Sequence, residues 1–341
     1  MPMMLHYFLR RVFLIGFVFV ALTVLAFSLG YLFPGDVLTN VSGLTNIQPE
    51  RQQALIKYYA LDQSLLQQYI AYVNRILDGE WGLSFSSQQP VLSEIIAVFP
   101  ATLELASYAL ILSFVLGIPL GLFAAVKADS FFGKLISGVT LVAYSIPIFW
   151  WALLLIMLFS LTLGVLPTAG RINVLFDIPT TTGFMLPDIW LSDISYKSEA
   201  IQDALRHLLL PAIVLATYPT TVMIRFTRDS MLAVLEQSYI KTARAKGLSR
   251  AQVLYHHGLR NALLPVIRQI GLQFSTLITL AMITEVIFSW PGIGQWLLDS
   301  IYQRNYPAIQ GGLLVVSCLV IVVNMLTEIL HTLFNPLARK A

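Results

Sequence analysis

The stretch at residues 239–265, YIKTARAKGLSRAQVLYHHGLRNALLP, is the longest strongly basic part of an otherwise apolar chain. We call it the basic segment. Its five cations stand against no acidic residue: Lys241, Arg244, Lys246, Arg250 and Arg260. Apolar residues at helical spacing follow Gly247, so we expect two short helices joined at that glycine. Basic loops of membrane proteins most often only fix orientation. The ordered pattern that ends in Leu264-Pro265 instead favours a more specific role than that of such a loop.

The composition of the chain indicates a membrane protein. Of its 341 residues, 57% are hydrophobic and 11% are charged, whereas a soluble domain carries about a quarter charged residues. Four runs without Asp, Glu, Lys or Arg each exceed the roughly 18 apolar residues of a bilayer-spanning helix; they cover residues 12–33, 105–126, 135–170 and 305–327. The first run resembles a signal peptide but is longer and lacks an A-x-A-like cleavage site, so we interpret it as an uncleaved span.

The predicted fold is an all-α polytopic membrane protein with six transmembrane helices, at about 10–33, 99–126, 135–165, 207–227, 263–289 and 307–333. An N-terminal first helix (1–33) precedes an extracytoplasmic segment (34–98), in which we expect helices at about 49–59 and 65–77. A membrane core (99–333) follows, with a cytoplasmic segment at 228–262, and the tail is 334–341. On the proposed inner side lie 14 of the 21 Lys and Arg residues, which places both termini in the cytoplasm.

Three features within these spans predict local structure. The sequence GIPLG at residues 117–121 permits close helix contact through its glycines, or a kink at Pro119. Pro147 lies near the middle of the third span, and we favour a tolerated kink over a broken helix there. Trp290 and Trp296 suit the interfacial aromatic belt.

Several kinds of chemistry are not indicated by the sequence. No G-x-x-x-x-G-K-[ST] motif occurs, so the chain is not expected to bind ATP through a P-loop. His256 and His257 lack further ligands at metal-binding spacing, and we expect surface positions for them and no metal or cofactor. No cluster of a nucleophile with a base is visible, which argues against a membrane-embedded enzyme.

Several blocks in order resemble the ABC transporter permease family for dipeptides, oligopeptides and nickel. They are LRR at 9–11, FPGD at 33–36, PATLEL at 100–105, GIPLG, YIKTARAKGLS, LRNALLP, EVIFSWPGIG at 285–294, NYPAIQGG and the closing Asn335-Pro336. The resemblance implies a MetI-like transmembrane domain of the ABC-importer type, with an extracytoplasmic insertion after the first helix. The chain departs from the family pattern at Lys241 and Thr242, and Asn305 stands where an aspartate is often seen before Tyr-Pro.

The same resemblance implies that the basic segment couples the permease to a separate ATPase. The implied coupling residues are Tyr239, Ala243, Lys246, Gly247, Leu248, Arg250, Leu264 and Pro265. It also implies four kinds of partner: a second homologous permease, two ATP-binding subunits, an extracytoplasmic peptide-binding protein and the lipid bilayer of the bacterial inner membrane.

Pieces such as FPATLEL, YSIPIFWWALLL and TTGFMLPDIWLSD look like the Sap permeases within this family. That likeness implies transport of peptides, with cationic antimicrobial peptides among them, and putrescine or polyamine export as the alternative. A passive channel or secondary carrier is the alternative of a different class; inverted repeats would favour it, and we see no convincing repeat.

Three carboxylates at membrane depth are candidates for the substrate path, because intramembrane acids are costly: Glu104, Glu285 and Glu328. The alternative is that each lies near an interface or pairs with a neighbour such as Arg225 or Arg268. We favour this structural role for all three.

Overall fold

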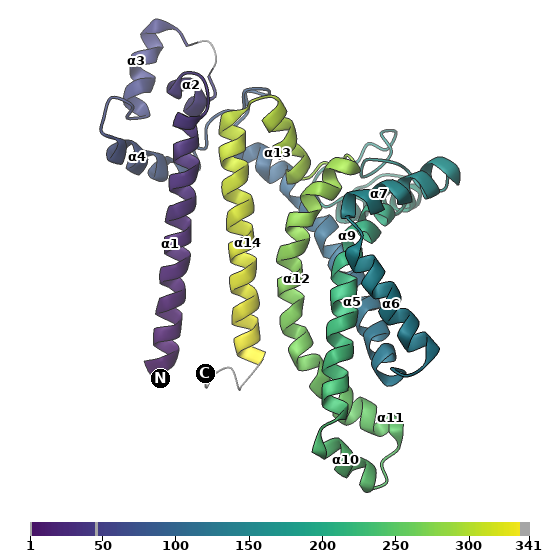
Figure 1. Ribbon diagram of the computed structural model, residues 1–341. Coiled ribbons are helices and arrows are strands. Elements are labelled where there is room, and N and C mark those ends of the chain that lie inside the picture. The colour runs from purple at the N-terminus through teal and green to yellow at the C-terminus, as the bar shows by residue number, and fades with distance from the viewer. Residues whose placement is uncertain (1, 45–46, 335–341) are drawn as a thin grey trace. The chain divides into compact units, whose positions relative to one another are not determined.

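The computed structural model describes residues 2–44 and 47–334 (Figure 1). Apart from one β-bridge between Leu83 and Pro90, the described residues form helices, turns and loops. The all-α prediction is therefore confirmed. Residues 335–341, which make up most of the predicted tail, lie outside the described part. The chain divides into two compact units, Met1–Pro100 with Pro291–Val322 and Ala101–Trp290 with Val323–Ala341.

The first unit joins the N-terminal hundred residues to a late part of the chain. Its helices are α1 (Pro2–Leu32), α2 (Val37–Ser42), α3 (Pro49–Tyr58), α4 (Leu65–Leu77), the start of α5 (Val91–Val126), α13 (Ile293–Tyr302) and most of α14 (Tyr306–Phe334). The two helices predicted between residues 34 and 98 are confirmed as α3 and α4. Ala26 of α1, Tyr72 of α4 and Leu314 of α14 are buried together in one apolar cluster. The segment after α1 thus packs against an element that lies far away in the sequence.

The second unit is built around the long helix α9 (Lys197–Leu235), which contacts α6, α7 and α12. Its other elements are the rest of α5, α6 (Phe131–Ser145), α7 (Ile148–Leu155), the π-helical η1 (Ile156–Thr162), α8 (Met185–Leu191), α10 (Ser238–Ala245), α11 (Arg250–Gln252), the π-helical η2 (Val253–Leu259) and α12 (Arg260–Ile287). A buried cluster of Ala152, Leu155, Leu210, Val214 and Phe288 joins α7 to α9 and the end of α12.

Close helix contact at the GIPLG sequence is confirmed. A Cβ atom added to Gly117 would lie 2.6 Å from the Cβ of Met223, and one added to Gly121 would lie 2.7 Å from the backbone oxygen of Ile224. Both glycines therefore let α5 approach α9 more closely than a larger residue permits.

The tolerated kink favoured for Pro147 is wrong, because the third predicted span is broken into two helices. α6 and α7 diverge by 105°, and Figure 1 shows α7 turned away from α6. Ile146 and Pro147 are both extended, with ψ angles of 126° and 133°. Proline disfavours helical geometry in the residue before it and has no N–H to continue the helix, and these two residues end α6.

Helices occupy all six predicted span positions, but six spans are not established. Within the described residues, three helices are long and apolar enough to cross a membrane: α5, α9 and residues Tyr306–Thr327 of α14. The broken pair α6–α7 with η1 makes a fourth if it is counted as one span. The remaining two positions hold shorter apolar stretches, Gly16–Leu32 in α1 and Leu272–Ile287 in α12.

Candidate functional site

The basic segment folds as two short helices joined at Gly247, as predicted. α10 ends at Ala245, and Gly247 follows with a φ angle of 82°, in the left-handed region that favours glycine. The chain then enters α11 and η2, which continue into α12. Ser249 opens this second helix with a reciprocal cap: its N–H donates to the Gln252 side chain at 2.9 Å, and the Gln252 N–H donates to its hydroxyl at 3.3 Å. α10 and α11 lie at the end where α12 begins (Figure 1).

Apolar packing holds the two short helices together as one body. Ile240 and Ala243 of α10 are buried against Val253 of η2, and Val234 and Leu235 at the end of α9 pack on the same cluster. The connection to α12 is tied by the Ser230 hydroxyl, which donates to the carbonyl of Ala262 at 2.8 Å. The basic segment is therefore anchored to the helix that precedes it, so a force on the segment is transmitted to α9 and α12.

The predicted coupling residues divide into a buried one and an exposed set. Ala243 is 7% exposed, so its methyl group serves the internal packing of the segment. The exposed residues are Tyr239, Lys246, Gly247, Leu248 and Pro265. The side chains of Arg250 and Leu264 lie outside the part of the chain that the structure describes. The turn from Lys246 to Leu248 is thus exposed along its whole length.

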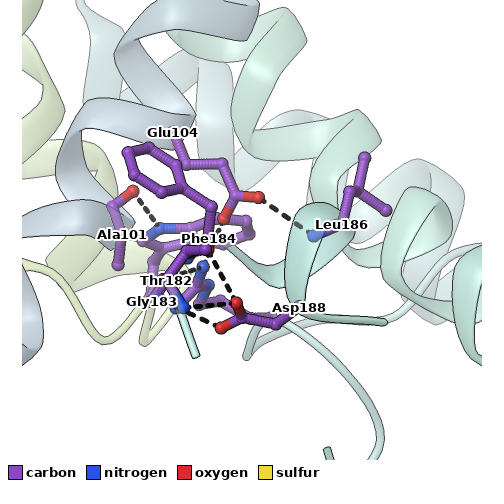
Figure 2. A network of polar contacts seen from close by, with 9 residues as sticks. Ala101, Glu104, Thr182, Gly183, Phe184, Leu186 and Asp188 are labelled. Atoms are coloured by element: carbon purple, nitrogen blue, oxygen red, sulfur yellow. Dashed lines mark hydrogen bonds and ion pairs between the residues drawn. The ribbon is translucent and has the colours of Figure 1, made fainter. Parts of the chain in front are cut away.

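Glu104 is buried and paired, but with a partner that the sequence did not indicate. It is 3% exposed and forms an ion pair with Arg171, and the Leu186 N–H lies 3.4 Å from its other carboxylate oxygen (Figure 2). The expectation that Glu104 pairs with a neighbour is confirmed, and the partner is Arg171 rather than either of the two arginines named as examples. Arg171 lies 67 positions along the chain, in an irregular connection, where no periodic pattern predicts an approach to α5.

Arg171 is held in place by a second contact and an aromatic surface. Its guanidinium donates to the carbonyl of Gly183 at 3.0 Å and lies 5.6 Å from the ring centroid of Trp290. Trp290 is 1% exposed, and its indole N–H donates to the carbonyl of Ala101 at 2.9 Å. The interfacial-belt prediction for Trp290 is therefore wrong, because the side chain is buried inside the second unit.

Asp188 fixes the turn that presents the Gly183 carbonyl to Arg171, and sequence reasoning missed it. Its carboxylate accepts from the N–H and hydroxyl of Thr182, both at 2.6 Å, and from the N–H of Gly183 at 2.9 Å (Figure 2). Burial acts to raise the pKa of Asp188, but the hydrogen bonds from Thr182, Gly183 and Thr181 outweigh it, and the pKa is lowered. A lone aspartate in a loop gives no sequence signal for such a turn.

The surroundings of the other two membrane-depth acids are described less fully. Glu285 is fully buried in α12, and the side chain of Glu328 lies outside the described residues. Arg225 of α9 instead lies over the ring of Tyr144 from α6, with 5.1 Å between its guanidinium carbon and the ring centroid. In the described part of the chain, no group of three His, Cys, Asp or Glu residues is placed to hold a metal ion.

The fold is that of an ABC importer's membrane subunit. A chain from the solved inward-facing MetNI methionine ABC transporter superposes with a TM-score of 0.54 at 15% identity, covering 72% of this chain and 99% of that chain. A second crystal form of the same transporter gives 0.55. At this identity the likeness shows the fold alone, and it confirms the MetI-like prediction.

Sequence families then define the class more closely. The family described as "Binding-protein-dependent transport system inner membrane component" matches residues 117–340, and the one described as "Binding-prot-dependent transport system membrane comp, N-term" matches residues 4–106. The chain belongs to this family of binding-protein-dependent inner membrane permeases. It is a multi-pass inner membrane protein and the permease rather than the ATPase, so the alternative of a passive channel or secondary carrier is set aside.

Relatives similar along nearly the whole chain have known names. The di/tripeptide transport system permease protein DppB of Pseudomonas aeruginosa is 46% identical, covering 98% of this chain and 99% of the relative. The dipeptide transport system permease protein DppB of Escherichia coli K12 is 45% identical with the same coverage. The putrescine export system permease protein SapB of Escherichia coli K12 is 41% identical, covering 99% of this chain and 98% of the relative.

Proposed function

We propose that this chain is the membrane-spanning permease subunit of an ABC transporter that moves short peptides. The observation that carries the proposal is the likeness to peptide permeases over nearly the whole length, at 45–46% identity. By their names, one of the two DppB relatives transports di- and tripeptides and the other transports dipeptides.

The identities favour a dipeptide-type permease over the Sap type that the sequence pieces suggested. SapB relatives are 40–41% identical, a few per cent below the DppB relatives. Putrescine export therefore stands as the second candidate, supported by the name of one SapB relative at 41% identity. Transport assays of one reconstituted complex, with di- and tripeptides and with putrescine as substrates, distinguish the two candidate functions.

The proposed topology has six spans with both termini in the cytoplasm. α1 has 31 residues and α12 has 28, and at 1.5 Å per residue each is longer than the roughly 30 Å hydrocarbon core. The basic segment between α9 and α12 lies on the same side as the termini, in agreement with the positive-inside rule. Residues 34–90, with α2 to α4, then lie outside.

The proposed partners are a second permease, two ATPase subunits and an extracytoplasmic binding protein. The exposed turn at Lys246, Gly247 and Leu248 docks into the ATPase, while buried Ala243 lets α10 pack tightly on η2. Movement of the ATPases then displaces the segment as one body and rocks α9 and α12 between two states of the permease. Glu104 serves a structural role in this scheme, because its charge is matched by Arg171.

The proposal is tested by ATPase activity of the complex reconstituted in lipid vesicles, with Gly247→Glu compared with wild type. Gly164→Glu is the matched control: both glycines have positive φ, at 82° and 63°, and a Cβ meets nothing within 4 Å at either site. The two variants therefore introduce the same charge and similar backbone strain. We expect Gly247→Glu to lose ATPase assembly or peptide-stimulated hydrolysis and Gly164→Glu to keep both.

Each other outcome has a definite meaning. Coupled transport at the wild-type rate in Gly247→Glu removes this turn from the docking interface. Equal losses in both variants assign the effect to backbone strain. Peptide movement by this chain without any ATPase overturns the ABC assignment itself.

A further inference from the structure

We propose that Arg225, together with Tyr144 and Tyr218, binds the carboxylate group of the transported peptide within the membrane-spanning part of the permease. This inference rests on the proposed peptide function. It names a substrate-binding site on α6 and α9 that includes none of the acids that the sequence singled out.

Arg225 is a charged residue that has no acidic partner among the described residues. It lies in α9, one of the three helices that are long and apolar enough to cross a membrane, and it is exposed. Within the described ranges, the ion pairs join Arg171 to Glu104, His207 to Asp203 and Arg228 to Asp229. An unpaired cation in a spanning helix is costly unless it reaches water, in a cavity or at the interface, or binds a ligand.

The ring of Tyr144 holds the guanidinium in a defined place, and Tyr218 stacks on Tyr144. The Arg225 carbon lies 5.1 Å from the Tyr144 ring centroid. The rings of Tyr144 and Tyr218 stack with centroids 5.3 Å apart and planes 27° from parallel. A ring binds the flat face of a guanidinium and leaves its N–H edge free. That edge is a fork of donors that fits a carboxylate with two parallel hydrogen bonds.

The break between α6 and α7 adds to the attraction for an anion. Tyr144 lies in the last turn of α6, and α7 begins at Ile148 without any side-chain cap. α7 stays against the same part of α9, because the Trp151 indole N–H donates to the Thr217 hydroxyl at 3.0 Å. In transporters with discontinuous helices, the N-terminus of a half-helix points at anionic groups of the substrate. The uncapped start of α7 is a supporting feature here, beside the cation.

The chemistry of the three side chains selects the carboxylate end of a peptide. Arg225 offers only donors, and the tyrosine hydroxyls add donors or acceptors, whereas none of these three side chains is a carboxylate that could hold an ammonium group. Every unmodified peptide carries a terminal carboxylate whatever its side chains. A site for that group therefore suits a path that must accept many peptide sequences.

The experiment is peptide uptake by the full complex in proteoliposomes, with trialanine compared with trialanine amide. Arg225→Gln is the test variant and Arg228→Gln the matched control, because Arg228 lies on the same helix but is ion-paired with Asp229 at 3.1 Å. Using one binding protein throughout cancels its own preference from the comparison. We expect Arg225→Gln to slow trialanine uptake about ten- to a hundredfold at low substrate, with no effect on the amide, and Arg228→Gln to match wild type.

Arg225→Lys keeps the charge but loses the two-pronged geometry, and we expect an intermediate loss for trialanine only. This variant keeps the test decisive if Arg225→Gln fails to assemble. The inference is overturned if Arg225 variants transport trialanine as wild type does, if Arg228→Gln shows the same loss, or if the loss follows the anionic lipid content of the vesicles instead of the peptide terminus. Failure of the wild type to take up any peptide overturns the proposed function instead.

Discussion

Glu104 and Arg225 are both charged residues in predicted spans, but they differ in burial and in their partners. Glu104 is 3% exposed, and its charge is matched by Arg171 and by a backbone N–H. Arg225 is exposed, and it lies over the aromatic ring of Tyr144. A matched, buried charge holds elements together, whereas an unmatched, exposed one is available to a ligand. The sequence marks both as unusual, and only the surroundings tell them apart.

The largest effect is expected from breaking the matched pair. Glu104→Ala leaves Arg171 buried without its counter-ion, and removing one partner of a buried pair costs about 3–5 kcal/mol. We expect a large fall in the thermal midpoint of the detergent-purified chain. Arg225→Ala is the counterpart, and its midpoint should stay close to wild type. A similar fall in both variants would show that the two charges do not differ in the way described.

A smaller effect is expected at Asp188, which supports the Arg171 side of the pair. Asp188→Asn cannot accept all three hydrogen bonds, and we expect a loss of about 1–3 kcal/mol at neutral pH. Because the pKa of Asp188 is lowered below the ordinary value of 3.8, its contribution is fully present above that value. It is lost as the pH falls through the lower folded-state pKa.

The measurement is the difference in thermal midpoint between wild type and Asp188→Asn as a function of pH. The difference should be constant from neutral pH to about pH 5 and should shrink below 3.8. A difference that already shrinks between pH 7 and pH 5 would mean that another group dominates the stability of this turn.

Helix positions were predictable from the sequence, whereas the polar contacts were not. Long apolar runs and the spacing of Gly117 and Gly121 can be interpreted locally, so all six helix positions and a close helix contact at the glycines were predicted. The partner helix, α9, was not. The break at Pro147 depended on two consecutive extended residues, and a single proline is compatible with either outcome.

In the candidate site, too, local features were predicted from the sequence and contacts between distant residues were not. Gly247 was identified because a glycine between two helical patterns predicts a break between two helices from the local sequence alone. Arg171 and Trp290 were not identified as neighbours of Glu104, since each comes from an irregular connection whose path no period predicts. Burial of Ala243 also followed from packing between helices, which composition alone does not reveal.

The smallest effect on stability is expected at Asn305, an uncharged buried side chain whose polar atoms are all hydrogen-bonded. It is 1% exposed in the first unit; its amide nitrogen lies 2.7 Å from the Ser84 hydroxyl, and its oxygen accepts from the Phe85 N–H at 3.0 Å. An aspartate at this position keeps the acceptor for Phe85, and the Ser84 hydroxyl can reverse and donate to the second oxygen. The aspartate that is often seen at this position in the permease family is therefore compatible with the same contacts.

We expect Asn305→Asp to lower the stability by about 1 kcal/mol. Asn305→Ala leaves the Phe85 N–H unpaired and should lower it more. Both effects are measured as shifts of the thermal midpoint. If Asn305→Asp is as damaging as Asn305→Ala, the Ser84 hydroxyl does not reverse, and burying the charge outweighs the contacts that the carboxylate makes.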